Sequence, residues 1–299
     1  MLVIQDVLGA VRMWKAGDLV VRKSYGRDIC FIVVGIDMAR GVAILKGLDL
    51  RLLADAPFDD LAAMTASDWE SYQISQAKLE HETLRLVQLR RQGERDKLGY
   101  RSEKRKQPRD FFELPGRVLH LDGDGAYLEK CLSVYGRLGI RAVGKNIPEA
   151  SMPGAMAQLL EEHHPDILII TGHDGVLHDA KSADLASIDN YRNSDNFMRA
   201  VHSARKVERS LDELIIFAGA CQSHYEALLE AGANFASSPE RVLIHALDPV
   251  FLAEQIAYTP INETVDIFRI VTSTITGTEG LGGVETRGKY RIGLPRSRY

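Results

Sequence analysis

Cysteine is scarce in this chain of 299 residues, which contains only three. An odd number of cysteines at irregular spacing argues against a disulfide framework and against a zinc cluster. Cys30 lies in an apolar run and Cys131 on an apolar helical stripe, so both are expected to be buried small hydrophobic residues. Cys221 differs, because it lies where a strand is expected to turn into a helix. We therefore expect Cys221 alone to have a chemical role.

Long apolar runs and an excess of basic charge are also lacking. No run approaches the roughly 18 apolar residues of a membrane-spanning helix, and Gln5, Asp6 and Arg12 interrupt the N-terminal stretch, unlike a signal peptide. With 37 Lys and Arg against 41 Asp and Glu, the net charge of −4 argues against a nucleic-acid-binding protein that is basic throughout. The sequence therefore predicts a cytoplasmic protein with no membrane span and no nucleic-acid partner.

Length and local pattern predict two globular parts and a connection. Three short strand-like runs with turn residues between them predict a small SH3-like β-barrel module over residues 1–56. Residues 57–113 are expected to be a helical, basic linker, with a capping box from Ser67 to Glu70. Residues 114–299 alternate between strand and helix patterns, which predicts an α/β domain: three-layer and doubly wound, with a mostly parallel sheet. Its expected elements are strand 117–121, helix 126–138, strand 140–146, helix 151–163, strand 166–171, helix 190–207, strand 213–218, a helix after Cys221, strand 241–247 and helix 249–258.

Two apolar runs organise the α/β domain. The first begins at residue 166 and leads to His173, and the second begins at residue 213 and leads to Cys221. Each run is short, β-branched and closed by glycine, which is typical of a strand buried on both faces. In an open α/β sheet the functional groups gather at the carboxyl ends of the strands. If the two strands are neighbours, about 4.8 Å apart, an imidazole and a thiol converge there.

The residues around this cysteine favour a nucleophile. Ser223 to Glu226 has the pattern of a capping box that opens an apolar helix. A helix N-terminus and a nearby histidine both favour the thiolate, which is the nucleophilic form. Cys221 is thus the expected nucleophile and His173 the general acid and base, a dyad that needs no metal and no organic cofactor. His178, with Asp179, could orient this imidazole or face water.

A strand that ends in His, followed 48 residues later (221 minus 173) by a strand that ends in Ala-Cys, resembles the cysteine peptidases of the caspase, gingipain, clostripain and legumain group. More closely, the domain order and the stretches 119–124 and 172–175 resemble the sporulation-specific YabG peptidases, over nearly the whole chain. The resemblance implies a caspase-like fold and an endopeptidase that processes spore-coat or cortex-associated precursor proteins. It also implies cleavage after Arg in the mother cell of a sporulating bacterium. Self-cleavage in the basic linker is a further expectation.

The same resemblance implies an oxyanion hole. The main-chain N–H groups of Asp174 or Gly175, together with that of Cys221, would stabilise the tetrahedral intermediate. The chain departs from the wider group at two positions: Asp174 stands where glycine usually follows the histidine, and Gly219 stands where an acidic residue or Gln usually lies two residues before the cysteine.

Cleavage after Arg requires a carboxylate in the first specificity pocket, because a planar guanidinium is bound best by a bidentate acid. Asp122 and Asp124 follow the first strand of the α/β domain, at the edge where this pocket is expected. The same positions suit a turn or a helix cap. Both interpretations stay open.

Two other classes of function stay open. Residues 219–223 approach the G-x-C-x-G turn of a glutamine amidotransferase-like hydrolase, which would need a glycine in place of Ser223 and a histidine after the cysteine, such as His245. The third class is a non-catalytic α/β interaction protein. Loss of His173 would separate the first two classes, and an interaction protein would tolerate loss of Cys221. The sequence leaves the oligomeric state open, including a homo-oligomer.

Overall fold

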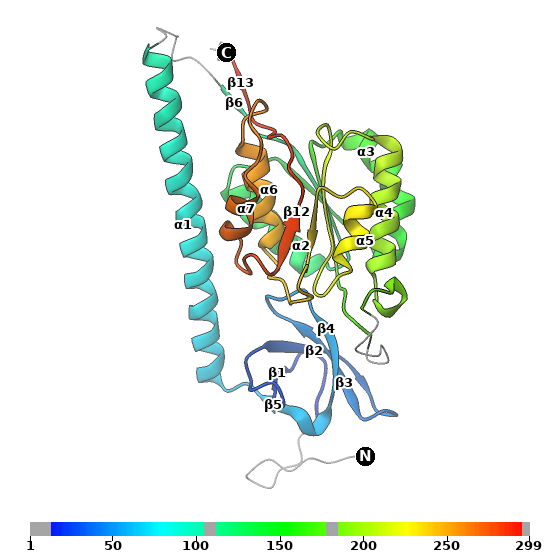
Figure 1. The fold of residues 1–299 in the computed structure, drawn as a ribbon. Helices are drawn as coiled ribbons and strands as arrows, with labels where there is room; N and C mark the ends of the chain where they lie inside the picture. Colours follow the sequence, from blue (N-terminus) through cyan, green and yellow to red (C-terminus); the bar gives the residue numbers. More distant parts are fainter. Residues whose placement is uncertain (1–12, 105–111, 178–184, 295–299) are drawn as a thin grey trace. The chain divides into compact units, whose positions relative to one another are not determined.

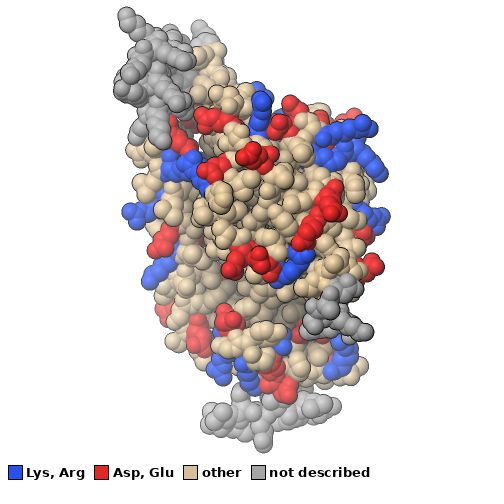
Figure 2. All heavy atoms as spheres, in the orientation of Figure 1, with Lys and Arg blue, Asp and Glu red and all other residues tan. Residues whose placement is uncertain are grey.

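The computed structural model describes residues 13–104, 112–177 and 185–294 (Figure 1). The chain divides into two compact units, Met1–Ala77 and Lys78–Tyr299. The domain limits predicted from the sequence, at residues 56 and 113, stay predictions. Within the described residues, no helix is both long enough and apolar enough to cross a bilayer. Acidic and basic side chains are interspersed on the face that Figure 2 shows.

The first unit is built on a five-stranded antiparallel sheet in the order β4-β3-β2-β1-β5. The three predicted strand-like runs form β1 (Leu19–Arg22), β2 (Cys30–Asp37) and β3 (Val42–Gly47), and the sequence analysis missed β4 (Leu53–Pro57) and β5 (Leu61–Ala63). Alternate side chains of these strands, such as Val20, Val33 and Leu45, are buried in one apolar cluster. The predicted strands thus form an antiparallel sheet, while the SH3-like character of this sheet stays a prediction.

Helix α1 (Ala66–Lys104) starts earlier than predicted. The capping box predicted from Ser67 to Glu70 is wrong, because Thr65 takes this role: its Oγ1 accepts the N–H of Asp68 (3.1 Å), and Asp68 Oδ2 accepts the N–H of Thr65 (3.1 Å). The middle of α1 belongs to the second unit, where Leu84 and Val87 join the apolar core.

The second unit holds a six-stranded sheet in the order β12-β11-β10-β9-β7-β8. All neighbouring pairs are parallel except the pair of β11 and β12. Helices cover both faces of this sheet (Figure 1): α2, α6 and α7 on one, and α3, α4 and α5 on the other. The predicted α/β class with a mostly parallel sheet is confirmed, and the caspase-like detail stays a prediction. The strands of this sheet are β7 (Val118–Asp122), β8 (Ala142–Asn146), β9 (Ile167–Thr171), β10 (Ile215–Ala218), β11 (Phe235–Ser237) and β12 (Leu281–Gly283). The helices are α2 (Gly125–Arg137), α3 (Met152–His163), α4 (Ser194–Val207), α5 (Tyr225–Glu230), α6 (Asp248–Tyr258) and α7 (Ile267–Ser273). A separate two-stranded pair is formed by β6 (Phe112–Leu114) and β13 (Arg291–Gly293).

The strand predicted over residues 241–247 is wrong. The strand that pairs with β10 is instead the three-residue β11, and residues 241–247 fold back over the turn after β10. Gln222 donates its N–H to Val242 O (3.0 Å), and Ile244 donates its N–H to Cys221 Sγ (3.3 Å). Residues 241–247 are called the cover segment below.

Candidate active site

The sheet brings the two predicted catalytic residues to the same edge. Strands β9 and β10 are parallel neighbours, and Ile170 pairs with Ala218. His173 and Cys221 each lie three residues beyond this pair, in the two loops that leave the carboxyl edge of the sheet. The predicted adjacency of the two strands is therefore confirmed.

The imidazole of His173 is held by a carboxylate. Its Nε2 lies 2.9 Å from Asp124 Oδ2, and only 12% of the His173 side chain is exposed. A carboxylate can only accept, so Nε2 carries the proton in this pair. Nδ1 is buried and has no hydrogen-bond partner among the residues that the structure describes. The Tyr127 ring packs against the imidazole, with ring centroids 5.4 Å apart. In the neutral ring, Nδ1 is then the nitrogen that can take a proton.

The two aspartates predicted for a specificity pocket have other partners. Asp124 is the N-cap of α2, since its Oδ1 accepts the N–H groups of Ala126 (2.9 Å) and Tyr127 (3.2 Å). Asp122 is fully buried, and its oxygens accept the N–H of Asp124 (2.8 Å) and the hydroxyl of Thr171 (2.9 Å). The helix-cap interpretation of Asp124 is confirmed. The pocket role stays a prediction, and full burial argues against Asp122.

Cys221 is fully buried beneath the cover segment. Besides the bond from Ile244 N–H, its Sγ lies 3.7 Å from Ile244 O. The His173 ring packs against Tyr127 near the start of α2, and Cys221 contacts Ile244 in the segment that leads into α6. The fold gathers the thiol and the imidazole at one edge, and the cover segment closes the thiol off from solvent.

The capping box predicted from Ser223 to Glu226 is wrong. The N-cap of α5 is His224, whose Nδ1 accepts the N–H of Ala227 (3.3 Å). The hydroxyl of Ser223 instead accepts the N–H of Ala220 (2.9 Å). Helix α5 begins four residues after Cys221 and has only six residues. The helix dipole therefore contributes less to a thiolate here than the sequence suggested, since the effect is confined to the first turn.

The main chain around the thiol is strained. Among the residues that the structure describes, five other than glycine have positive φ, and three of them are Gln222 (54°), Ser238 (65°) and Arg241 (55°). These three lie in the turn that carries Cys221 or in the loop that runs into and through the cover segment. Such strain costs of order 1–3 kcal/mol per residue and concentrates at functional sites. Its position favours Cys221 as a functional residue.

Comparison with known proteins identifies the family. The family model described as YabG peptidase U57 matches residues 15–295. The chain is also 42% identical over 286 residues to a protein of Bacillus subtilis (strain 168) named sporulation-specific protease YabG, covering 94% of this chain and 98% of that protein. The chain belongs to the YabG peptidase family. No solved structure matches it.

Membership of the YabG peptidase family confirms that the chain is an enzyme of the peptidase class. A non-catalytic interaction protein is therefore not the best description. The catalytic residues stay predictions, and the pair of His178 and Asp179 lies outside the described residues. Within the described ranges, no group of three or more His, Cys, Asp or Glu side chains is arranged to hold a metal ion.

Sequence reasoning missed Glu149, which lies beside His173. It stands in the short 3-10 helix after β8, and its Oε1 accepts the N–H of His173 (2.9 Å). A Cβ atom on Gly123 or Gly172 would overlap the Glu149 carboxylate, so both glycines make room for it. The available signal was its place just after a predicted strand of the same sheet, at the edge where functional groups gather.

The loop after β9 holds the predicted oxyanion residues. Gly175 donates its N–H to Asp174 Oδ1 (2.9 Å), so this N–H is already occupied in the closed site. The Asp174 side chain is fully buried, and this burial raises the pKa of Asp174 against the opposing effect of its hydrogen bonds. The oxyanion role of the Asp174 and Cys221 N–H groups stays a prediction.

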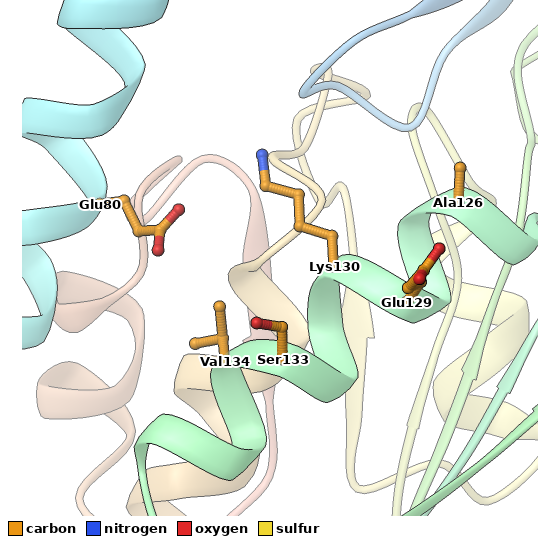
Figure 3. A pocket seen from close by; sticks show the side chains of 6 residues that line it. All are labelled: Glu80, Ala126, Glu129, Lys130, Ser133 and Val134. Atoms are coloured by element: carbon orange, nitrogen blue, oxygen red, sulfur yellow. The ribbon is translucent and has the colours of Figure 1, made fainter.

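A groove of about 350 Å³ lies apart from these residues, between α1 and α2. Figure 3 shows Glu80 of α1 opposite Lys130, Ser133 and Val134 of α2. Neither His173 nor Cys221 lines it, and it carries no part of the chemistry discussed below.

Asp248 binds the end of the cover segment, and its burial leads us to expect that the free energy of unfolding depends on pH. Its Oδ2 accepts the N–H of His245 (2.9 Å) and its Oδ1 accepts the N–H of Ile275 (2.7 Å). Complete burial raises the pKa of Asp248 to about 6, from about 3.9 in an unfolded chain. The folded state therefore binds a proton more tightly than the unfolded state, and the resulting stability is full below about pH 4 and lost as the pH rises to about 6.

Urea unfolding of the wild type and of Asp248→Asn between pH 4 and 7 tests this. The difference in free energy of unfolding, wild type minus variant, is expected to fall by about 2 kcal/mol across this range. All other titrating groups cancel in the difference. A difference that is constant, or that rises with pH, would contradict the raised pKa.

Proposed function

We propose that this chain is a cysteine endopeptidase in which Cys221 is the nucleophile, His173 is the general acid and base, and Asp124 orients the imidazole. The observation that carries the proposal is the hydrogen bond of 2.9 Å between His173 Nε2 and Asp124 Oδ2, which leaves Nδ1 as an unpartnered base. The edge where Nδ1 lies also carries Cys221, through the pairing of β9 with β10. This arrangement of nucleophile, base and orienting acid is the general geometry of covalent acyl transfer.

The chemistry follows from these three groups. His173 Nδ1 takes the thiol proton, and the Cys221 thiolate attacks the scissile carbonyl carbon to form a tetrahedral intermediate. The protonated Nδ1 then gives its proton to the leaving amine as the C–N bond breaks. Water, deprotonated by Nδ1, attacks the acyl-enzyme, and the C–S bond breaks to release the acid and the thiol. Asp124 stabilises the imidazolium in both halves and fixes the tautomer.

The cover segment must move before a substrate can react. Cys221 is fully buried and its Sγ contacts the main chain of Ile244, so a carbonyl carbon reaches Sγ only after Ile244 is displaced. The strained residues Ser238 and Arg241 both precede Ile244 in the chain, and release of their positive φ would offset part of the cost of opening. The described conformation is therefore the closed state of the site.

Similarity to a protein named sporulation-specific protease YabG supports a role in sporulation. We assign the enzyme to the processing of spore-coat or cortex-associated precursor proteins in the mother cell, with cleavage after Arg. Asp122 is fully buried, and Asp124 binds His173 and caps α2, which argues against both as the acid that binds this Arg. Protein substrates are the partners that this function requires.

A peptide cleavage assay tests the proposal. The purified protein is incubated with a set of peptides that differ only in Arg, Lys, Gln or Leu at one position, with and without iodoacetamide, and the products are mapped by mass spectrometry. Cleavage after Arg is expected, together with its loss when Cys221 carries the alkyl group. New N-termini within the protein's own basic linker would reveal self-cleavage. Full activity of protein alkylated at Cys221 would reject the mechanism.

Replacement of Asp124 by asparagine is expected to separate its role in orienting the His173 imidazole from its role in capping α2. Asn keeps a side-chain oxygen to cap α2, but its amide group meets Nε2 as a donor and favours the tautomer with the proton on Nδ1. We expect kcat to fall by about 10- to 100-fold because the base is then in the wrong tautomer. Steady-state kinetics and thermal unfolding check this, with Asp124→Ser as a second variant that caps the helix and does not reach the imidazole. An unchanged kcat in both variants would remove Asp124 from the site.

A further inference from the structure

The buried carboxylate of Asp174 links the loop after β9 to the turn after β10. Its Oδ1 accepts the main-chain N–H groups of Gly175 (2.9 Å) and Asn193 (2.8 Å). Its Oδ2 accepts the hydroxyls of Ser194 (2.5 Å) and Ser223 (2.8 Å). Three of these partners belong to the loop after β9 or to the start of α4. Ser223 belongs to the turn that carries Cys221, so this bond joins the two halves of the candidate site.

Ser223 connects Asp174 to the residue before the nucleophile. Its Oγ donates to Asp174 and accepts the N–H of Ala220 (2.9 Å), the residue before Cys221. The carbonyl of Ala220 is held in turn by the hydroxyl of Ser237 (2.8 Å). One hydroxyl therefore closes the turn around Cys221 and ties it to the carboxylate that immediately follows His173.

We propose that Asp174 is a positioning residue for the nucleophile, acting through Ser223 to hold the Cys221 turn in register with His173. The inference rests on the proposed roles of Cys221 and His173. Four donors converge on the two oxygens of this buried side chain, and a displacement of about 1 Å in a reacting group can cost about 100-fold in rate. The inference also explains why this chain has an acid directly after its histidine.

A purely structural role makes a different prediction. Asp174 also lies at the start of α4, where Asn193 and Ser194 precede and open the helix. If the carboxylate served only that helix, loss of either hydroxyl would lower stability and leave the activity of the folded molecules unchanged. Ser223 and Ser194 form a pair for this question, because both are fully buried and both donate to the same oxygen. They differ in what else they bind: Ser223 Oγ accepts the N–H of Ala220, directly before Cys221, whereas Ser194 Oγ accepts the N–H of His224, at the start of α5.

The experiment compares Ser223→Ala with Ser194→Ala in the full chain, with kcat and KM measured on one peptide and normalised to the folded fraction by circular dichroism. Ser223→Ala is expected to lower kcat by about 10- to 100-fold with KM within about threefold, and to slow alkylation of Cys221 by iodoacetamide. Ser194→Ala removes the acceptor of the His224 N–H, which lies beyond Ser223, but it keeps the path from Asp174 through Ser223 to Ala220. Its kcat is therefore expected to stay within about threefold of wild type. Asp174→Asn keeps the size of the side chain but turns an amide donor toward the hydroxyls of Ser194 and Ser223. Its kcat is expected to fall as in Ser223→Ala. If Ser223→Ala does not fold, the kcat of Asp174→Asn tests the positioning role.

Equal kcat values for the two serine variants, or a wild-type kcat in Asp174→Asn, would overturn the inference. Failure of the proposed function looks different, because alkylation of Cys221 in the wild type would then leave activity intact. The two failures are therefore distinguished in the same set of measurements.

Discussion

Replacement of Cys221 by alanine is expected to abolish peptide hydrolysis, with kcat/KM lower by about 10³-fold or more, because the covalent step has no nucleophile. The variant should fold, since Cys221 is a small buried residue whose loss removes one sulfur atom from contact with Ile244. Initial rates on an Arg-containing peptide and the N-termini of incubated protein both check the result. Fragments that form equally in wild type and variant would point to a contaminating protease and remove the support for a cysteine mechanism.

Cys131→Ala is the matched control for this prediction. Cys131 is also fully buried, and its Sγ donates to Ala246 O (3.3 Å) in the same cover segment that Cys221 contacts. Loss of either thiol therefore removes one sulfur contact with that segment, and only one of the two removes a nucleophile. Cys131→Ala is expected to keep kcat within about threefold of wild type and to lose about 1–2 kcal/mol of stability. Equal loss of activity in both variants would mean that the thiols act by packing.

The sequence predicted the parts of the site that depend on local pattern. The apolar runs of β9 and β10 show that both strands are buried, and the carboxyl edge of a parallel sheet then places His173 and Cys221 together. The hydrogen-bond partner of His173 could not be predicted from local pattern, because Asp124 is 49 residues away in the chain and lies beside His173 only through the pairing of β7 with β9. The alternatives of pocket acid and helix cap could not be decided before that pairing was known.

The errors near Cys221 share one cause. Residues 241–247 have the apolar character of a strand, but Ile244 and the residues that follow it are buried by packing over the end of β10. The strand that pairs there, β11, has only three residues and no period to detect. In the same way, Ser223 has the spacing of a helix cap, but its hydroxyl donates to the buried carboxylate of Asp174 instead. Tertiary contacts overrode local propensity at the point where the fold builds its site.

Replacement of His173 by glutamine is expected to lower kcat by about 10²- to 10⁴-fold, the range that general acid and base catalysis contributes. Glutamine keeps an amide donor for Asp124 Oδ2, so the carboxylate is not left unpaired, but no group remains to take the thiol proton. The residual rate is expected to rise with pH, because the thiolate then forms only as the cysteine itself ionises. Rates measured from pH 6 to 9 test this, and a variant that is inactive only because it is unfolded would not recover at high pH.

His245→Asn is the control that separates this mechanism from an amidotransferase-like hydrolase, in which a histidine after the cysteine is the base. His245 lies in the cover segment, and its Nδ1 accepts the N–H of Leu247 (3.1 Å), a bond that an asparagine oxygen can accept in its place. With His173 as the base, His245→Asn is expected to stay within about threefold of wild type, since it leaves the nucleophile and the base unchanged. The reverse pattern, with full activity in His173→Gln and loss in His245→Asn, would transfer the role of base to the cover segment.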